Sequence, residues 1–241
     1  MFGLGTIINT AAVVAGGLIG VTLKKGIPER CKNVLMQACG VATIFIGSSG
    51  VLKYMIVVDG AEIRTQGSML LIFSLVIGGL IGALLDIETR LEHLGDWLKK
   101  KFQSEGDSLF VEGFVTSTLV ICVGAMAIVG SIEDGLTGNF STLTAKAILD
   151  FVIVIVFASA LGKGVLFSAL PLFLYQGAIT CLAKAFGNFM STVLIREISF
   201  VGSALIFCVG INVGFGKKFN VGNLLPAMLI PAIYEIIRLF F

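Results

Sequence analysis

Eight apolar runs, each about 20 residues long, occupy most of the 241-residue chain. A helix needs about 20 mostly apolar residues to cross the hydrocarbon core of a membrane. Charged residues make up 13% of the chain, about half the ~25% of a typical soluble domain, so too little polar surface remains to cover a soluble particle. The runs comprise residues 4–23, 34–52, 68–85, 110–130, 143–161, 165–186, 198–215 and 221–240. They predict an all-α integral membrane protein that forms one polytopic domain over residues 1–241.

The number of spans is eight in this interpretation, with seven as the alternative. Glycines at 47 and 50 interrupt the second run, and the sequence GKG at 162–164 joins the fifth and sixth runs by either a tight hairpin or a re-entrant segment. With eight alternating spans, eleven of the 17 Lys and Arg residues fall on one side. Because cytoplasmic loops are enriched in Lys and Arg, we expect that side to be cytoplasmic and both termini to be extracytoplasmic.

One connection, residues 86–108, is long enough to form an element of its own. Apolar side chains recur at helical spacing from Ile87 to Phe102, while acidic and basic side chains such as Glu88 take the opposite side. The segment also holds Trp97, the only tryptophan, and a lysine cluster. This pattern predicts a cytoplasmic amphipathic helix that lies in the membrane interface; a solvated cytoplasmic helix is the alternative.

Small residues spaced by four positions recur in the odd-numbered runs. The pentapeptide GGLIG occurs at residues 16–20 and again at 78–82, and the seventh run ends with glycines in the same spacing. Such glycines allow membrane helices to approach closely. The positions predicted to serve helix packing are Gly16, Gly20, Gly78, Gly82, Gly210 and Gly214. Their recurrence favours internal helical repeats over chance in a glycine-rich chain.

Charged residues inside the apolar runs are the first candidates for a transport or ion-binding site. Lys146 and Asp150 lie four positions apart, on one face of the fifth run, where an unpaired carboxylate is costly. Glu133 and Asp134 lie in a glycine-flanked stretch that we interpret as a break between the fourth and fifth runs. Adjacent carboxylates at a helix break favour a cation or proton site; solvated acids of an outer loop are the alternative.

Three neutral amides complete the candidate site: Asn9 in the first run, Gln176 in the sixth and Asn212 in the seventh. Such side chains bind ligands or, more often, join helices by hydrogen bonds. No catalytic or nucleotide-binding motif occurs, and the cysteines and the single histidine form no metal-ligand pattern. We therefore predict neither an enzyme nor a cofactor or metal site. A net charge of +2 with scattered basic residues argues against nucleic-acid binding.

Several short stretches are similar to the bacterial YqgA-like membrane family, which is catalogued as domain of unknown function number 554. The similarity covers nearly the whole chain, and its central stretch is the most specific. The matching stretches are GTIIN at residues 5–9, GAMAIVGSIEDGL at 124–136, KAILD at 146–150, YQG at 175–177 and NLLPA at 223–227. The resemblance implies a multi-pass protein of a bacterial inner membrane and implies no substrate.

Repeats, a broken helix and buried ionisable groups together favour a secondary transporter for a small solute or ion, coupled to H⁺ or Na⁺. We expect it to work within the lipid bilayer as a homo-oligomer. Two alternatives remain open, namely an oligomeric passive channel and a non-transporting membrane scaffold or sensor partner.

Overall fold

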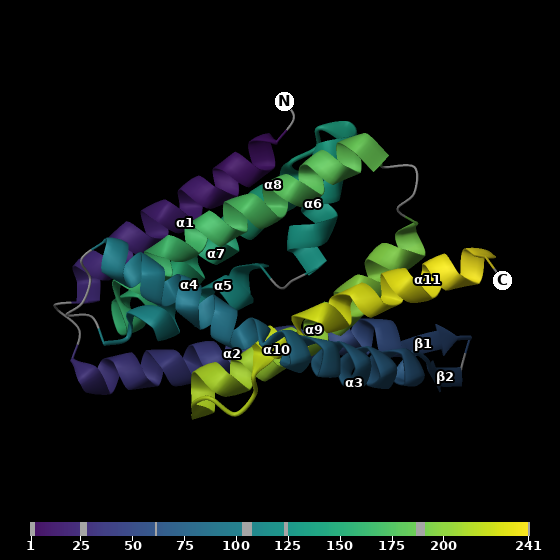
Figure 1. Ribbon diagram of the computed structural model, residues 1–241, viewed down its shortest axis with the longest axis horizontal. Coiled ribbons are helices and arrows are strands. Elements are labelled where there is room, and N and C mark those ends of the chain that lie inside the picture. Colours follow the sequence, from purple (N-terminus) through teal and green to yellow (C-terminus); the bar gives the residue numbers. More distant parts are fainter. Residues whose placement is uncertain are drawn as a thin grey trace.

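Helices form nearly all of the computed structural model, which describes residues 3–24, 28–60, 62–102, 108–122, 125–186 and 191–240 (Figure 1). The α-helices are α1 (Leu4–Leu23), α2 (Glu29–Met55), α3 (Ser68–Leu85), α4 (Ile87–Lys101), α5 (Phe110–Cys122), α6 (Ala125–Thr137), α7 (Ser141–Leu161), α8 (Ala169–Phe186), α9 (Thr192–Phe215), α10 (Val221–Leu224) and α11 (Ile230–Phe240). Two 3₁₀ helices, η2 (Lys163–Ser168) and η4 (Leu225–Leu229), precede α8 and α11. A helix satisfies its own backbone hydrogen bonds, which lipid cannot do.

Six of these helices are long and apolar enough to cross a membrane: α1, α2, α3, α7, η2 with α8, and α9. Their outward faces are apolar. On α3, for example, Ile72, Phe73 and Val76 are each more than half exposed, whereas Ser74 is buried. This arrangement suits a surrounding of lipid rather than water. The prediction of an all-α membrane protein is thus confirmed.

The fourth apolar run differs from its predicted form of one span at 110–130. It forms two helices, α5 and α6, whose axes differ by 58°, and α6 continues to Thr137. The predicted break at Glu133 and Asp134 is therefore wrong, because both residues lie within α6. The glycines of this stretch serve packing instead: a Cβ added at Gly130 would lie 2.9 Å from the Leu143 side chain, and one at Gly135 would lie 2.5 Å from the Thr180 carbonyl oxygen.

The eighth run also differs from the predicted continuous span at 221–240. It is divided into α10, η4 and α11, and Val221–Glu235 is shorter than a spanning helix. Pro226 and Pro231 account for the interruption, because proline lacks a backbone N–H and clashes with the preceding turn. By length and composition the described residues provide six spans, or seven if α5 and α6 together cross the membrane.

The helices form two groups that are visible in Figure 1. The first group consists of α1, α5, α6, α7 and α8, and the second consists of α2, α3, α9, η4, α10 and α11. Within the first group α1 packs along α7 and α6 along α8, whereas within the second α2 packs along α9 and α3 along η4. Each group therefore contains helices from both the N-terminal and the C-terminal parts of the chain.

Helix direction in the first group favours counting the bent pair α5–α6 as one span. A Cβ added at Gly5 would lie 2.8 Å from Leu143, near the start of α7, and one at Gly16 would lie 2.7 Å from the Phe151 carbonyl oxygen, further along α7. Helices α1 and α7 are thus parallel. With α2 and α3 crossing between them, this direction requires an odd third crossing, which only α5–α6 provides.

The glycines predicted to serve packing all lie at contacts between helices. Gly16 and Gly20 meet α7, whereas Gly78 and Gly82 meet Ala227 and Asn223. Gly210 and Gly214 meet α2, where an added Cβ at Gly210 would lie 2.6 Å from the Ile44 amide nitrogen. The two GGLIG copies pack on partners of opposite direction, because α3 runs antiparallel to α10–η4. Close approach explains the shared motif, and the internal repeat stays a prediction.

Two of the connections between the apolar runs form secondary structure of their own. Between α2 and α3 lies an antiparallel hairpin of β1 (Ile56–Asp59) and β2 (Glu62–Thr65), paired from Ile56↔Thr65 to Asp59↔Glu62, which the sequence analysis missed. The predicted amphipathic segment forms α4. Leu98 is buried against the protein and Trp97 is about half exposed, as expected for a helix at a membrane interface. Glu88, predicted on the polar side, is instead buried.

Candidate functional site

An ion pair lies buried within α7. Lys146 donates a short hydrogen bond to Oδ2 of Asp150, and both side chains are less than a tenth exposed. One turn of helix separates the two residues, so a single element brings them together. The rest of α7 is apolar from Phe151 to Phe157, so its backbone would be stable without either charge. Removing two charges from water is costly, and a residue pair kept in such a place is a candidate for function.

Two amides from neighbouring helices extend this pair. Asn9 of α1 donates from Nδ2 to Asp150 Oδ2 at 3.0 Å and to Gln176 Oε1 of α8 at 3.3 Å. Both amides are fully buried. Glycine packing between α1 and α7 brings Asn9 within hydrogen-bonding distance of Asp150. We call Asn9, Lys146, Asp150 and Gln176 the buried polar cluster. Of the predicted site residues, these four are brought together.

The two acids of α6 lie nearer the start of α1. Asp134 is fully buried, and its Oδ2 accepts a hydrogen bond of 2.9 Å from the Gly5 amide. Gly5 is in the first turn of α1, where the helix dipole favours a negative charge and where α1 has no acidic residue of its own. Glu133 is half-buried and accepts a hydrogen bond of 2.6 Å from Thr142 Oγ1. Both acids therefore link α6 to its neighbours.

Several buried polar atoms of this region have no hydrogen-bond partner among the described residues. They are Asn9 Oδ1, Gln176 Nε2, Asp134 Oδ1 and Ser131 Oγ. Buried polar groups without partners are rare and costly. In a polar site of this kind we expect them to bind ordered water.

Asn212 is the predicted site residue that lies elsewhere. Its Oδ1 accepts hydrogen bonds from the amides of Lys218 and Phe219, and its Nδ2 donates to the Phe219 carbonyl oxygen at 2.7 Å. These three bonds fix the turn after α9. Asn212 thus shapes a loop and makes no contact with the buried polar cluster.

Sequence reasoning also missed contributors to the site. Thr6 and Thr180 are buried, with 3.5 Å between their hydroxyl oxygens, and join α1 to α8. Cys122, at the end of α5, is buried, and α5 packs against α7, which carries Lys146 and Asp150. The i, i+4 spacing of Gln176 and Thr180 on one helix face could have indicated the threonine, but nothing local to Cys122 distinguishes it from a structural cysteine.

Comparisons with known proteins confirm the family resemblance. The family described as "Protein of unknown function (DUF554)" matches residues 4–236. The chain is 36% identical over 229 residues to the uncharacterized membrane protein YdfK of Bacillus subtilis (strain 168), covering 95% of this chain and 94% of that protein. It is 27% identical over 231 residues to the uncharacterized protein YqgA of Escherichia coli (strain K12), covering 94% of each. No solved structure matches the chain.

Proposed function

We propose that this chain, which belongs to the DUF554 family, is a secondary transporter that couples the movement of a small solute to H⁺ or Na⁺. The observation that carries the proposal is the buried polar cluster, in which an ion pair on α7 is hydrogen-bonded to α1 and connected through Asn9 to α8. Ionisable groups within membrane helices are costly and typically mark ion or substrate pathways. A purely structural helix contact needs no charge here, because glycine packing already joins α1 to α7.

The coupling step follows from the chemistry of the pair. A proton or Na⁺ that reaches Asp150 competes with the Lys146 ammonium for the same carboxylate. One positive charge replaces another, so the buried carboxylate is never left unpaired. Asn9 Oδ1, an oxygen without a partner among the described residues, provides a further neutral ligand beside Asp150. The displaced Lys146 ammonium must in turn move to another acceptor or give up its proton. Because Asp150 Oδ2 also accepts a hydrogen bond from Asn9 of α1, ion binding at this oxygen would change the contact between α7 and α1.

The acids of α6 form an approach to this site. Asp134 meets α1 at Gly5 and Asp150 meets it at Asn9, so the two contacts are four residues or about 6 Å apart along the helix. Glu133, half-buried, is the outermost of the three carboxylates. A cation therefore meets a series of carboxylates from the end of α6 towards the middle of α7.

We further propose a bacterial inner-membrane location with the N-terminus outside, assembly as a homo-oligomer, and no enzymatic activity. His93, the single histidine, belongs to α4, outside the first group, so it is poorly placed to activate a serine near the cluster.

The orientation of the protein in the membrane is tested by single cysteines that replace Arg64 of the β-hairpin and Lys218 of the turn after α9, both exposed. An impermeant thiol reagent should label the first in intact cells and the second only after lysis.

Ion movement in proteoliposomes tests the function and separates it from a channel or a scaffold. Vesicles that contain a pH-sensitive or Na⁺-sensitive dye are mixed with an extract of bacterial small molecules. A coupled carrier moves the ion only when the extract is added, a channel leaks without it, and a scaffold does neither. Asp150→Asn should abolish the response, whereas Glu92→Gln, an exposed-carboxylate control on α4, should not. An unchanged response in Asp150→Asn would show that the pair is only structural.

A further inference from the structure

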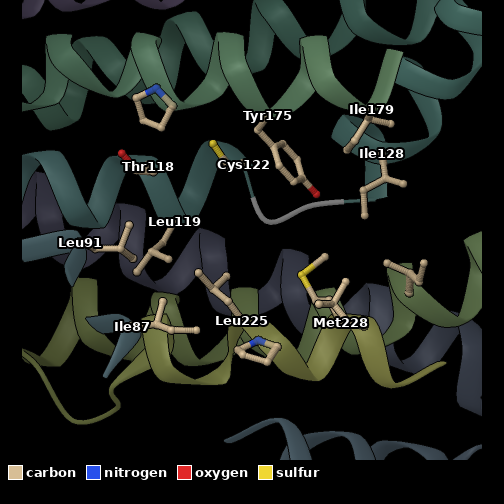
Figure 2. A pocket seen from close by; sticks show the side chains of 14 residues that line it. Ile87, Leu91, Thr118, Leu119, Cys122, Ile128, Tyr175, Ile179, Leu225 and Met228 are labelled. Atoms are coloured by element: carbon tan, nitrogen blue, oxygen red, sulfur yellow. The ribbon is translucent and has the colours of Figure 1, made fainter. Parts of the chain in front are cut away.

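A cavity of about 520 Å³ lies between the two helix groups (Figure 2). One wall comes from α5, α6 and α8 of the first group, and the opposite wall comes from α4, α9 and η4. Its volume is within the ~300–1,000 Å³ of small-molecule sites. The glycine contacts join helices within each group, whereas this cavity separates the groups, which is where transporters of related halves bind their substrates.

The two walls differ in chemistry. The second group presents only apolar side chains, among them Ile198, Leu225 and Met228. The first group adds three residues with polar side chains, Thr118, Cys122 and Tyr175. Figure 2 shows the Tyr175 side chain extending from α8 towards the opposite wall. No charged side chain lines the cavity among the described residues, so a charged molecule would lose its hydration without compensation.

Tyr175 provides the hydroxyl that faces the cavity. Thr118 lines the same wall, but its side chain is buried, at 7% exposure, and its Oγ1 is enclosed by protein atoms. A threonine in a helix normally returns its hydroxyl to a carbonyl oxygen of the preceding turn, as Thr10 and Thr144 do here. Thr118 does not, and its Oγ1 has no hydrogen-bond partner in the part of the chain that the structure describes.

The polar wall also adjoins the buried polar cluster. Cys122 lines the cavity at the end of α5, and α5 packs against α7, which carries Lys146 and Asp150. Tyr175 lines the cavity, and Gln176, the next residue of α8, belongs to the cluster. A molecule bound against this wall thus contacts the helix whose Gln176 is linked to the ion pair through Asn9.

We infer that the cavity binds an uncharged, mostly apolar solute with one hydroxyl or similar hydrogen-bonding group, its polar end against Tyr175 and its apolar body against η4 and α9. The identification of this solute as the transported substrate rests on the proposed function, but its binding does not. The ligand contacts both groups and so joins them across the cavity.

Photolabelling of the full chain in liposomes tests the site with two probes of equal length, an octanol and an octane that each carry a diazirine. We expect saturable octanol labelling of α5 and α8 peptides that unlabelled octanol competes away. Leu225→Trp, which fills the cavity, should reduce it at least tenfold, whereas Leu174→Trp on the exposed face of α8 should not. Tyr175→Phe should weaken octanol binding about three- to tenfold, the effect of one hydrogen bond, and leave octane labelling unchanged.

Three results would overturn the inference. They are labelling that does not saturate, equal binding of octanol and octane with no effect of Tyr175→Phe, and a phospholipid found by native mass spectrometry in the wild type but not in Leu225→Trp, which would assign the cavity to lipid. Melting curves verify that each variant folds. Saturable octanol labelling without any coupled ion movement would keep the binding site and reject the transport proposal, and coupled ion movement without labelling would do the reverse.

Discussion

Two clusters of charged side chains among the described residues differ in how deeply they are buried. Lys146 and Asp150 are both less than a tenth exposed within α7. At the start of α4, Glu88 is 9% exposed, but its partner Lys217 is 54% exposed and the second carboxylate, Glu92, is 40% exposed. Charges in the first cluster are compensated only by protein atoms, whereas those in the second are shared with solvent. Removing one partner of the ion pair should therefore destabilise the protein more in the first cluster than in the second.

The second cluster has a structural task that explains its position. Glu88 Oε2 accepts a hydrogen bond of 2.5 Å from the Gly222 amide in the first turn of α10, and the Glu88 amide donates to Asn223 Oδ1 at 2.8 Å. Lys217 donates to Glu92 Oε1 at 2.8 Å. These bonds fasten α4 to the α9–α10 turn, and their loss should affect local structure rather than ion coupling.

The largest effect is expected from Lys146→Ala. It leaves Asp150 buried without its cation, which costs about 3–5 kcal/mol in comparable buried pairs. Asp150→Asn should cost less, and the double variant Lys146→Ala/Asp150→Asn should recover much of the stability without ion coupling. Denaturant titration in mixed micelles measures the free energy of unfolding, with Lys218→Ala as the exposed control. A loss of stability below about 1 kcal/mol for Lys146→Ala would mean that the buried pair contributes no more to stability than an exposed ion pair does.

Glu88→Ala should have the second largest effect. It removes both the partner of Lys217 and the acceptor of the Gly222 amide, and a hydrogen bond to a charged group contributes about 1.5–3 kcal/mol. Protease sensitivity of the α9–α10 turn should rise, whereas ion movement in liposomes should persist at the wild-type level. Glu92→Ala is the matched control, because Glu92 contacts Lys217 but not α10. Loss of ion coupling in Glu88→Ala would transfer the functional role to this second cluster.

Lys217→Met should have a smaller effect on stability, about 0–1 kcal/mol, because more than half of the lysine side chain is exposed and solvent screens its charge. Glu88 keeps its hydrogen bond to Gly222 in this variant, so α10 remains capped. The same titration measures the change. A loss as large as that of Glu88→Ala would mean that the ion pair, rather than the hydrogen bond to α10, holds α4 in place.

Sequence patterns predicted the membrane class and four members of the buried polar cluster for a clear physical reason. Hydropathy acts over whole helices, and charges or amides inside apolar runs stand out against it. The break in α5–α6 and the hairpin after α2 were not predicted, because local signals for both are weak within apolar surroundings. Asn212 was predicted in the site although it holds a turn, a role that is not visible without knowing which side chains meet.

The smallest effect expected concerns pH and again separates the two clusters. The hydrogen bond to Glu92 raises the pKa of Lys217 above its ordinary value, with Glu88 adding to the rise and burial opposing it. A pKa that is higher in the folded than in the unfolded protein means that folding favours the protonated lysine. The stabilisation is therefore complete below about pH 10.4, the value of a free lysine, and is lost as pH rises through the folded pKa.

The stability difference between wild type and Lys217→Met should be constant from about pH 7 to pH 9 and should shrink above about pH 10.4. Lys218→Met is the control, because Lys218 makes no ion pair among the described residues, and its difference from wild type should show no such decline. A difference for Lys217→Met that stays constant to pH 11 or above, within the range where the protein remains folded, would mean that the lysine acts through its alkyl chain and that the second cluster depends on Glu88 and Gly222 alone.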